Sequence, residues 1–362
     1  MTQTEAMLVL NMLPRLGPVS VRRLLHRFGD PQGVLRARRP DLARVEGLNA
    51  PAMESLLGWE TETDLAAEMR RIENAGVNVV TILDAEYPPS LKEIHDPPTV
   101  LYVWGTLEPR DFHAIAVVGS RRTSHYGLEC AKRFAYQLAY AGLTVVSGLA
   151  RGIDSAAHQG ALAAKGRTIA VLGGGLNQLY PPENLPLAER IASSGAVVSE
   201  FPMETQPDRQ TFPMRNRIIS GWSLGVLVVE AGLNSGALIS AHQAAEQGRS
   251  VYAVPGQVDR PTSTGSNRLI QEGAKLVIDA QDILNDLQSL FPNPPALQPS
   301  APADLPPELA AVYHAIGSEE TAIDQIIRQS GLSAGEATAA LLQLEVRNLV
   351  RQLPGKHFVK LL

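Results

Sequence analysis

The chain has 362 residues, 44% of them hydrophobic and 19% charged, which is typical of a globular protein with room for two or three domains. Its formal net charge of −5 excludes a protein that is basic overall, so any binding of nucleic acid requires a local patch. The single cysteine, Cys130, excludes an internal disulfide and argues against a thiolate metal site.

Residues 1–75 are expected to form a helical module. The chain begins without the basic start of a signal peptide, and no apolar run approaches ~20 residues; we therefore expect a cytoplasmic protein with no membrane contact. Two similar turns, around Gly17 and Gly47, are typical of helix-hairpin-helix modules. Eight arginines between positions 15 and 44 predict either a solvated helical face or a weak DNA contact, and both interpretations stay open.

Residues 76–290 are predicted to form an extended Rossmann-like domain, an α/β fold with a doubly wound parallel sheet. A proline-rich connector leads to a strand at Val100–Trp104, and apolar runs then alternate with amphipathic helices. The clearest crossover helices are Glu129–Ala141, where we expect Cys130 to be buried, and Ser155–Ala164. The further predicted strands are Ala114–Val118, Thr144–Ser147, Thr168–Leu172, Ala196–Ser199, Gly225–Val229, Ser250–Ala253 and Lys275–Ile278.

The C-terminal part is predicted to be a proline-rich linker, residues 291–304, followed by a winged-helix module, residues 305–362. The expected helices are Glu308–Ile316, Ile323–Ser330 and Ser333–Arg347, with a β-like wing at Leu349–Leu361. Ser333 and Glu336 have the spacing of a capping box at the third helix. Acidic side chains outnumber basic ones on that helix, which favours a protein-contact or accessory role over DNA reading.

Glycine and arginine follow several predicted strands. The turns are Gly119-Ser120-Arg121-Arg122, Gly148-Leu149-Ala150-Arg151, Gly173-Gly174-Gly175 and Ser235-Gly236. The carboxyl ends of neighbouring strands in a doubly wound sheet open onto one crevice, where ligands bind. Glycines let backbone N–H groups approach a phosphate closely, and helix N-termini favour its negative charge. The turns therefore predict a phosphate-binding surface.

The motifs of nucleotide enzymes are missing from these turns. Neither Gly-x-Gly-x-x-Gly nor Gly-x-x-x-x-Gly-Lys-Ser/Thr occurs after a predicted strand. The segment 211–220 instead places Arg215 and Arg217 beside an amide and a hydroxyl, and bidentate guanidinium donors suit phosphate oxygens. This pattern favours binding of a phosphodiester backbone over turnover. We expect no catalytic residue, no cofactor and no metal site.

A longer series of motifs resembles the DNA-processing protein A family (DprA/Smf). The motifs occur in family order along the whole central module. They are Gly119-Ser120-Arg121, Ser147-Gly148-Leu149-Ala150-Arg151-Gly152-Ile153-Asp154, Tyr180-Pro181-Pro182-Glu183-Asn184, Phe212-Pro213-Met214-Arg215-Asn216-Arg217-Ile218-Ile219-Ser220-Gly221, Val254-Pro255-Gly256 and Gly265-Ser266-Asn267-Arg268-Leu269-Ile270. The resemblance implies a homodimeric single-stranded DNA binder of natural transformation and recombination. It further implies a partner, a RecA-type recombinase that the protein loads onto DNA coated by single-strand binding protein.

The resemblance also implies the site residues. Arg121 is expected to be the principal phosphate contact, with Gly119 and Ser120 presenting backbone beside it. The dimer interface is expected at Leu269 and Ile270, whereas core is favoured for Leu276. The predicted DNA-binding set is Gly119, Ser120, Arg121, Arg122, Gly148, Arg151, Arg167, Gly173, Gly174, Arg215, Asn216, Arg217, Ser235, Gly236 and Asn267.

Three positions depart from the family pattern. Arg167 stands where a lysine is common and keeps the charge, whereas Asn234 replaces a common lysine or arginine and removes one cationic contact. Asn177 replaces a usual aspartate.

Several side chains keep two interpretations. Asp154 and His158 could form a metal pair, although a helix-start acid beside a packed or exposed histidine is favoured. Glu200 and Glu230 could be catalytic carboxylates, although acceptors that hold the pocket arginines are favoured. Arg151 could contact DNA or pair with an acid. The alternative function is a nucleotide-processing hydrolase of the phosphoribohydrolase type, but the stretch 230–236 lacks the Pro-Gly-Gly-x-Gly-Thr signature of those enzymes.

Overall fold

The computed structural model describes residues 1–288, 305–317, 321–346, 349–353 and 355–360. The chain forms two compact units, Met1–Pro295 and Ala296–Leu362. The predicted linker, residues 291–304, lies outside the described residues, as do Arg347 of the predicted third helix and Pro354 and Leu361 of the predicted wing.

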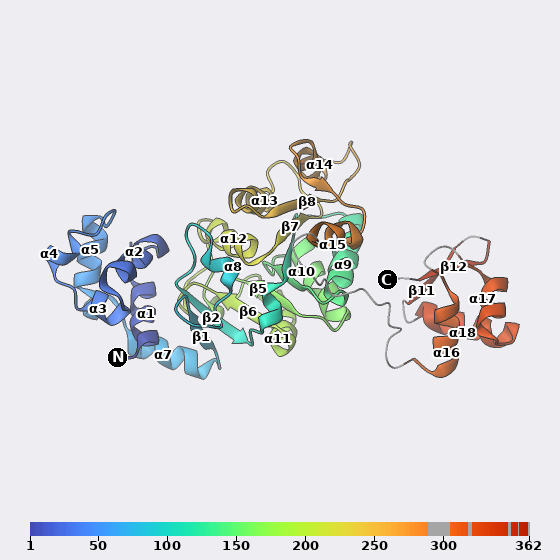
Figure 1. Cartoon of the computed structure of the whole chain (residues 1–362), viewed down its shortest axis with the longest axis horizontal. Coiled ribbons are helices and arrows are strands. Elements are labelled where there is room, and N and C mark those ends of the chain that lie inside the picture. Colours follow the sequence, from blue (N-terminus) through green and yellow to red (C-terminus); the bar gives the residue numbers. More distant parts are fainter. Residues whose placement is uncertain (289–304, 318–320, 347–348, 354, 361–362) are drawn as a thin grey trace. The chain divides into compact units, whose positions relative to one another are not determined.

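A nine-stranded sheet forms the centre of the first unit (Figure 1). Its strand order is β1-β2-β6-β5-β4-β3-β7-β8-β9. The strands are β1 (Asn78–Thr81), β2 (Val100–Gly105), β3 (Ala114–Val118), β4 (Thr144–Ser147), β5 (Thr168–Val171), β6 (Ala196–Ser199), β7 (Gly225–Val228), β8 (Ser250–Ala253) and β9 (Lys275–Leu276). β3 to β9 pair in parallel, as predicted, whereas β1 and β2 add an antiparallel edge. β1 was not predicted.

Helices cover both faces of this sheet, which explains why every residue of β3 is buried. One face is covered by α9 (His125–Tyr140), α10 (Ile153–Ala163), α11 (Leu185–Ser194) and α15 (Ala280–Gln288). The other face is covered by α8 (Pro89–Lys92), α12 (Thr211–Trp222), α13 (Gly236–Glu246) and α14 (Thr264–Gln271). The predicted doubly wound architecture is confirmed, and Cys130 is buried on α9.

No helix was predicted over residues 211–220, where the structure has α12. Pro213 lies in the first turn of that helix, where a missing backbone N–H and a fixed φ are tolerated. A proline this close to the helix start does not break the helix. The directions in which Arg215 and Arg217 point are therefore set by the helical repeat of α12.

The N-terminal residues form α1 (Gln3–Met12), α2 (Pro18–Phe28), α3 (Pro31–Leu35), α4 (Arg39–Leu42), α5 (Ala50–Leu57), α6 (Trp59–Glu62) and α7 (Leu65–Asn74). Their core is continuous with the edge of the sheet, since Leu8 and Leu24 share a cluster with Val100 and Tyr102. Polar contacts add to this: the Glu68 carboxylate accepts from the Met203 backbone N–H at 2.8 Å. These helices consequently belong to the same unit as the sheet.

The second unit is a winged helix, as predicted. It contains α16 (Pro307–Ala315), α17 (Ile323–Ser330), α18 (Ala334–Val346), β10 (Thr321–Ala322), β11 (Val350–Leu353) and β12 (His357–Lys360), with the strand order β10-β12-β11. The capping box is confirmed, because the Ser333 N–H donates to Glu336 at 2.9 Å and the Glu336 N–H donates back to the Ser333 hydroxyl at 3.4 Å. Within the described part of the chain, no helix has the length and apolarity needed to cross a membrane.

Candidate nucleic-acid interface

A crevice of about 480 Å³ opens at the carboxyl ends of β3 and β7. The chain leaves β3 toward β4 on one side and leaves β7 toward β8 on the other, so the crevice lies at the topological switch point where open α/β sheets bind ligands. Its lining comes from the end of β3 and the loop after it (118–122), from residues 150 and 154 where the chain enters α10, from Arg209 and α12 (212–219), and from the start of α13 with the two residues before it (234–240).

The β3–α9 loop presents Arg121 on a fixed turn. The Ser120 N–H donates to the Glu230 carbonyl at 2.7 Å, and the Ser120 hydroxyl accepts from the Arg122 N–H at 3.1 Å. Gly152, at φ +79°, lies against the Ser120 carbonyl, where any side chain would clash. The turn is therefore held by contacts from two neighbouring loops.

The Arg121 side chain is an exposed cation without an acidic partner. Its guanidinium lies 4.7 Å from the centroid of the Phe212 ring. Across the described residues, no carboxylate lies within ion-pairing distance of it. A stacked guanidinium keeps its N–H donors in the ring plane, free for an incoming phosphate.

Arg215 is the second arginine that lines the crevice, but its side chain is only 3% exposed. Its Nη1 donates to the Val171 carbonyl at 2.5 Å, and its guanidinium occupies the space where Gly148 lacks a side chain. Burial lowers its pKa to about 10, although the Asp154 carboxylate opposes the shift. Burial in turn raises the pKa of Asp154, opposed by Arg215. Arg215 thus supports the crevice floor, and Gly148 makes room for it.

Two predicted DNA contacts, Arg167 and Arg217, do not line the crevice. Successive helical residues are 100° apart, so Arg217 points away from Arg215; it is 5% exposed and paired with Glu200 and Asp96. Arg167 is buried at the amino end of β5, where it pairs with Asp111 and Glu108 at 2.7 and 2.8 Å. Carboxylates within the protein already compensate both charges, so these two arginines stabilise the fold.

Of the two interpretations of Arg151, the structure shows the pairing with an acid. Its Nε donates to Glu183 at 2.5 Å, and its guanidinium lies 5.7 Å from the Tyr180 ring centroid. Arg151 and Tyr180 border a small hollow that Arg121 and Phe212 also line. Arg151 is thus beside the crevice with its charge partly compensated.

Of the remaining predicted DNA-binding residues, some line the crevice and others support the loops around it. Gly119, Ser120, Arg122, Asn216, Ser235 and Gly236 line the crevice. Gly173 instead packs against Phe212, and Gly174 packs against Pro207. Asn267 bonds both the N–H and the carbonyl of Gly256 at 3.0 Å and so holds a different loop. Of the departures from the family pattern, Asn234 lines the crevice, whereas Asn177 donates to Glu204 at 2.7 Å on the surface.

Sequence reasoning missed Arg209 and Phe212. Arg209 is exposed and lines the crevice. The Phe212 ring lies between Arg121 and Arg215, with centroid distances of 4.7 and 5.9 Å, and 6.2 Å from the Tyr180 ring. An aromatic ring among cations is the arrangement on which unpaired bases stack. The signal was present in the sequence, because Phe212 lies between Arg209 and Arg215.

The candidate metal and catalytic side chains are engaged within the fold. His158 is fully buried and hydrogen-bonded to Thr168 at 2.7 Å, and burial lowers its pKa to about 3. Among the residues described, no group of three or more His, Cys, Asp or Glu side chains is placed to hold a metal ion. Glu200 holds an arginine, as favoured, but that arginine is Arg217, which does not line the crevice.

Among the described residues no arginine bonds Glu230, so the favoured interpretation was wrong for this side chain. Its Oε2 accepts from the Thr123 hydroxyl and from the Ser124 N–H and hydroxyl at 2.8 and 3.1 Å. Burial raises the pKa of Glu230, but the hydrogen bonds from Thr123, Thr262 and Ser124 together lower it below its usual value. Glu230 is therefore an ionised acceptor that holds the β3–α9 loop.

The apolar residues near the C-terminal edge of the sheet differ from expectation. Leu269 is buried in the core and Ile270 is half-buried against it. Leu276, for which core was favoured, is 46% exposed, and the prediction was wrong because β9 is an edge strand. Ile278 is 63% exposed beside it.

Comparison with known proteins gives consistent matches over both units. Residues 78–288 match the family profile of DNA recombination-mediator protein A, and residues 294–356 match that of the DprA winged helix domain. Protein Smf of Synechocystis is 36% identical over 378 residues, covering 95% of each chain. Protein Smf of Escherichia coli is 44% identical over 280 residues, covering 75% of this chain and 74% of the relative.

Two solved structures extend the comparison to the fold. The X-ray structure of DNA processing protein A (DprA) from Streptococcus pneumoniae has a TM-score of 0.70 at 37% identity, covering 79% of this chain and 98% of that one. DNA processing protein A from Helicobacter pylori, whose structure is described as giving insights into a single-stranded DNA binding mode, has a TM-score of 0.53 at 28% identity, covering 60% and 99%. The chain therefore belongs to the DNA recombination-mediator protein A family, DprA/Smf.

Proposed function

We propose that this protein binds single-stranded DNA in the crevice and loads a RecA-type recombinase onto it, in natural transformation and DNA recombination in the cytoplasm. The observation that carries the proposal is Arg121, an exposed cation that lines the crevice, stacks on Phe212 and has no ion-pair partner among the described residues. The Helicobacter pylori relative, described by its single-stranded DNA binding mode, supports it.

The proposed contacts are those residues that line the crevice. Arg121, Arg122 and Arg209 would bind phosphates, and the Phe212 ring would stack with a base. Gly119, Ser120, Asn216, Ser235 and Gly236 would add neutral hydrogen bonds and close backbone approach. Arg167, Arg217 and Asn267 act as supports for the fold. We propose binding without turnover, because the Glu230 carboxylate is engaged by the loop that it holds.

The loader role predicts an effect on a partner. On single-stranded DNA coated by single-strand binding protein, the wild-type protein should speed assembly of a RecA-type filament, followed by the ATPase activity of the recombinase. Arg121→Ala should lose this acceleration, while Arg268→Ala, which removes an exposed arginine of α14 paired with Glu272 at 2.7 Å, should keep it. If the wild-type protein leaves the rate of filament assembly unaltered, the proposed loader role is contradicted.

We further propose that the first unit pairs with a second copy through the exposed edge at Leu276 and Ile278. Leu276 of the edge strand β9 and the nearby Ile278 are both exposed, and exposed apolar side chains at a sheet edge favour association with another chain. Light scattering should give a dimer for the wild type and a monomer for the double variant Leu276→Lys, Ile278→Lys. Leu342→Lys, which changes a leucine 63% exposed on α18, is the control and should remain dimeric. A monomeric wild type with undiminished DNA binding would contradict the pairing.

A further inference from the structure

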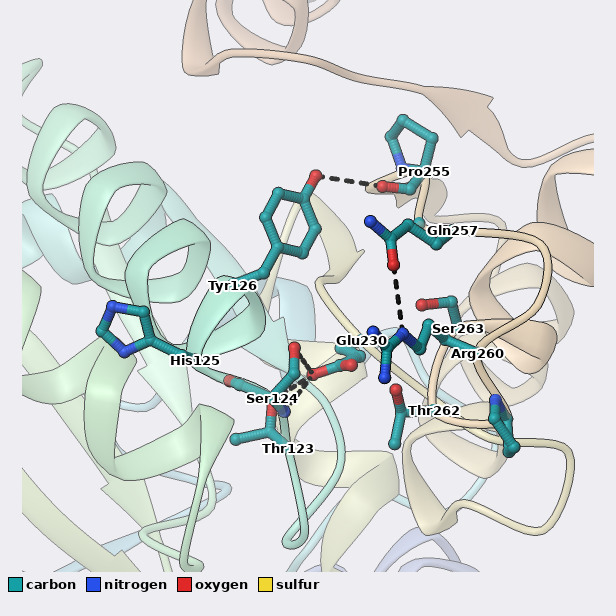
Figure 2. A pocket seen from close by; sticks show the side chains of 12 residues that line it. Thr123, Ser124, His125, Tyr126, Glu230, Pro255, Gln257, Arg260, Thr262 and Ser263 are labelled. Carbon is teal, nitrogen blue, oxygen red and sulfur yellow. Dashed lines mark hydrogen bonds between the residues drawn. The ribbon is translucent and has the colours of Figure 1, made fainter.

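A second cavity, of about 830 Å³, adjoins the same segment of the chain, from β3 into α9, that lines the crevice. Residues 119–122 of the loop line the crevice, and residues 123–126, which follow directly, line this cavity. The opposite wall is the loop after β8, residues 255–263, and Glu230 lies between the two walls (Figure 2). The volume falls within the roughly 300–1,000 Å³ that is usual for ligand pockets.

Tyr126 provides an aromatic wall. It lies in the first turn of α9, its side chain is 52% exposed, and its hydroxyl donates across the cavity to the Pro255 carbonyl at 3.1 Å (Figure 2). Burial of the hydroxyl raises the pKa of Tyr126 to about 12, so the hydroxyl stays protonated and remains a donor. The ring is thereby fixed at its tip, and a fixed aromatic face stacks with a base of any identity.

Arg260 provides a cation on the facing wall. Its Nε donates to the Gln257 side-chain oxygen at 3.1 Å, and its guanidinium lies between Gln257 and Thr262 (Figure 2). Over the described ranges, no carboxylate pairs with it. Its two terminal nitrogens are therefore available to a phosphate, and guanidinium–phosphate contacts are among the stronger hydrogen bonds.

The one acid of the lining, Glu230, does not oppose an anion here. Its side chain is 2% exposed and is turned into the donors of Thr123 and Ser124. What the cavity presents to a ligand is thus an aromatic face and an uncompensated guanidinium. This pair matches the base and the phosphate of a nucleotide.

We propose that this cavity, the Tyr126 pocket, receives the next nucleotide of the single strand held in the crevice, its base on Tyr126 and its phosphate on Arg260. The inference rests on the proposed function of the crevice. Arg122 and Thr123 are consecutive residues, with Cα atoms about 3.8 Å apart. A strand that leaves the crevice over this loop therefore meets the pocket without a gap.

The pocket is tested by binding a length series of oligothymidylates to the full chain. Arg260→Ala and Tyr126→Ala should each weaken the longer oligonucleotides about tenfold, and leave the shortest one that the wild type binds unchanged. Arg260→Ala should also lower the salt slope for the long oligonucleotides by about 0.7, the value for one phosphate of a single strand. Tyr126→Phe keeps the ring and should retain most of the affinity.

Arg121→Ala and Arg268→Ala serve as the two references. Arg121→Ala should weaken oligonucleotides of every length, and Arg268→Ala should weaken none. Long-oligonucleotide binding that survives both pocket substitutions, while Arg121→Ala loses it, would overturn the pocket and leave the crevice standing. An equal loss at all lengths in Arg260→Ala would also overturn it. Binding of thymidine 5′-monophosphate that persists with the crevice saturated, and that Arg260→Ala abolishes, would assign the pocket to free nucleotides instead.

Discussion

Replacing Arg217 with alanine is expected to destabilise the first unit by about 3–5 kcal/mol, the cost of removing one partner of a buried ion pair. Arg217 is 5% exposed, and it is the cation that pairs with Glu200, itself 7% exposed. Burial raises the pKa of Glu200, and Arg217 is the first charge that opposes this shift. Without Arg217 the carboxylate is left buried and uncompensated.

Urea denaturation followed by circular dichroism measures this loss. The double variant Arg217→Met, Glu200→Leu removes both charges and should regain much of the stability, because no buried charge is left unpaired. Arg122→Ala, at an exposed arginine of the crevice, should stay within about 0.5 kcal/mol of the wild type. A folded Arg217→Ala protein of wild-type stability would contradict this structural role of Arg217.

Replacing Arg121 with alanine is expected to weaken single-stranded DNA binding by about 1–3 kcal/mol while the fold stays intact. The side chain is exposed, and its contact within the protein is with the face of Phe212. Its removal therefore leaves no buried group without a partner. Arg121→Lys keeps the charge but loses the planar, bidentate donor, so its affinity should lie between those of the wild type and Arg121→Ala.

Fluorescence anisotropy with a labelled oligonucleotide measures the Arg121 effect, and a thermal melt of the same sample reports the fold. The salt slope of Arg121→Ala should fall by about 0.7 if one phosphate contact is lost. If a folded Arg121→Ala protein binds single-stranded DNA with wild-type affinity, Arg121 is not the principal phosphate contact.

The sheet could be predicted closely from the sequence because its strands are buried on both faces. Ala114–Val118 and Ala196–Ser199 are continuous apolar runs between turn signals, and the structure begins and ends β3 and β6 at those residues. β1 was missed because Asn78–Thr81 is only four residues long and pairs as an antiparallel edge, which leaves little pattern to detect. β9, at the other edge, has only two residues, so the apolar Leu276 was taken for core.

The site could be predicted only in part because proximity in sequence does not decide the direction of a side chain. Arg215 and Arg217 share one motif, yet α12 turns one under the crevice and the other into Glu200. Arg167 precedes β5, whereas the crevice opens at the carboxyl edge of the sheet, so its guanidinium lies at the opposite edge. The turn that carries Arg121 was placed at the crevice because a loop that follows a buried parallel strand lies at the carboxyl edge of the sheet, whereas the proposed role of Arg121 came from the family resemblance.

The most direct test of single-stranded DNA recognition is a competition between two forms of one sequence. The full-length wild-type protein is bound to a labelled single strand, and unlabelled single strand or blunt duplex is added at low and at moderate salt. The crevice predicts that the single strand competes well and the duplex poorly, because a single strand can lower successive phosphates and bases into a narrow pocket that a stiff duplex cannot enter. Both affinities should fall as salt rises. Duplex that competes as well as the single strand, or better, would contradict the assignment of this crevice.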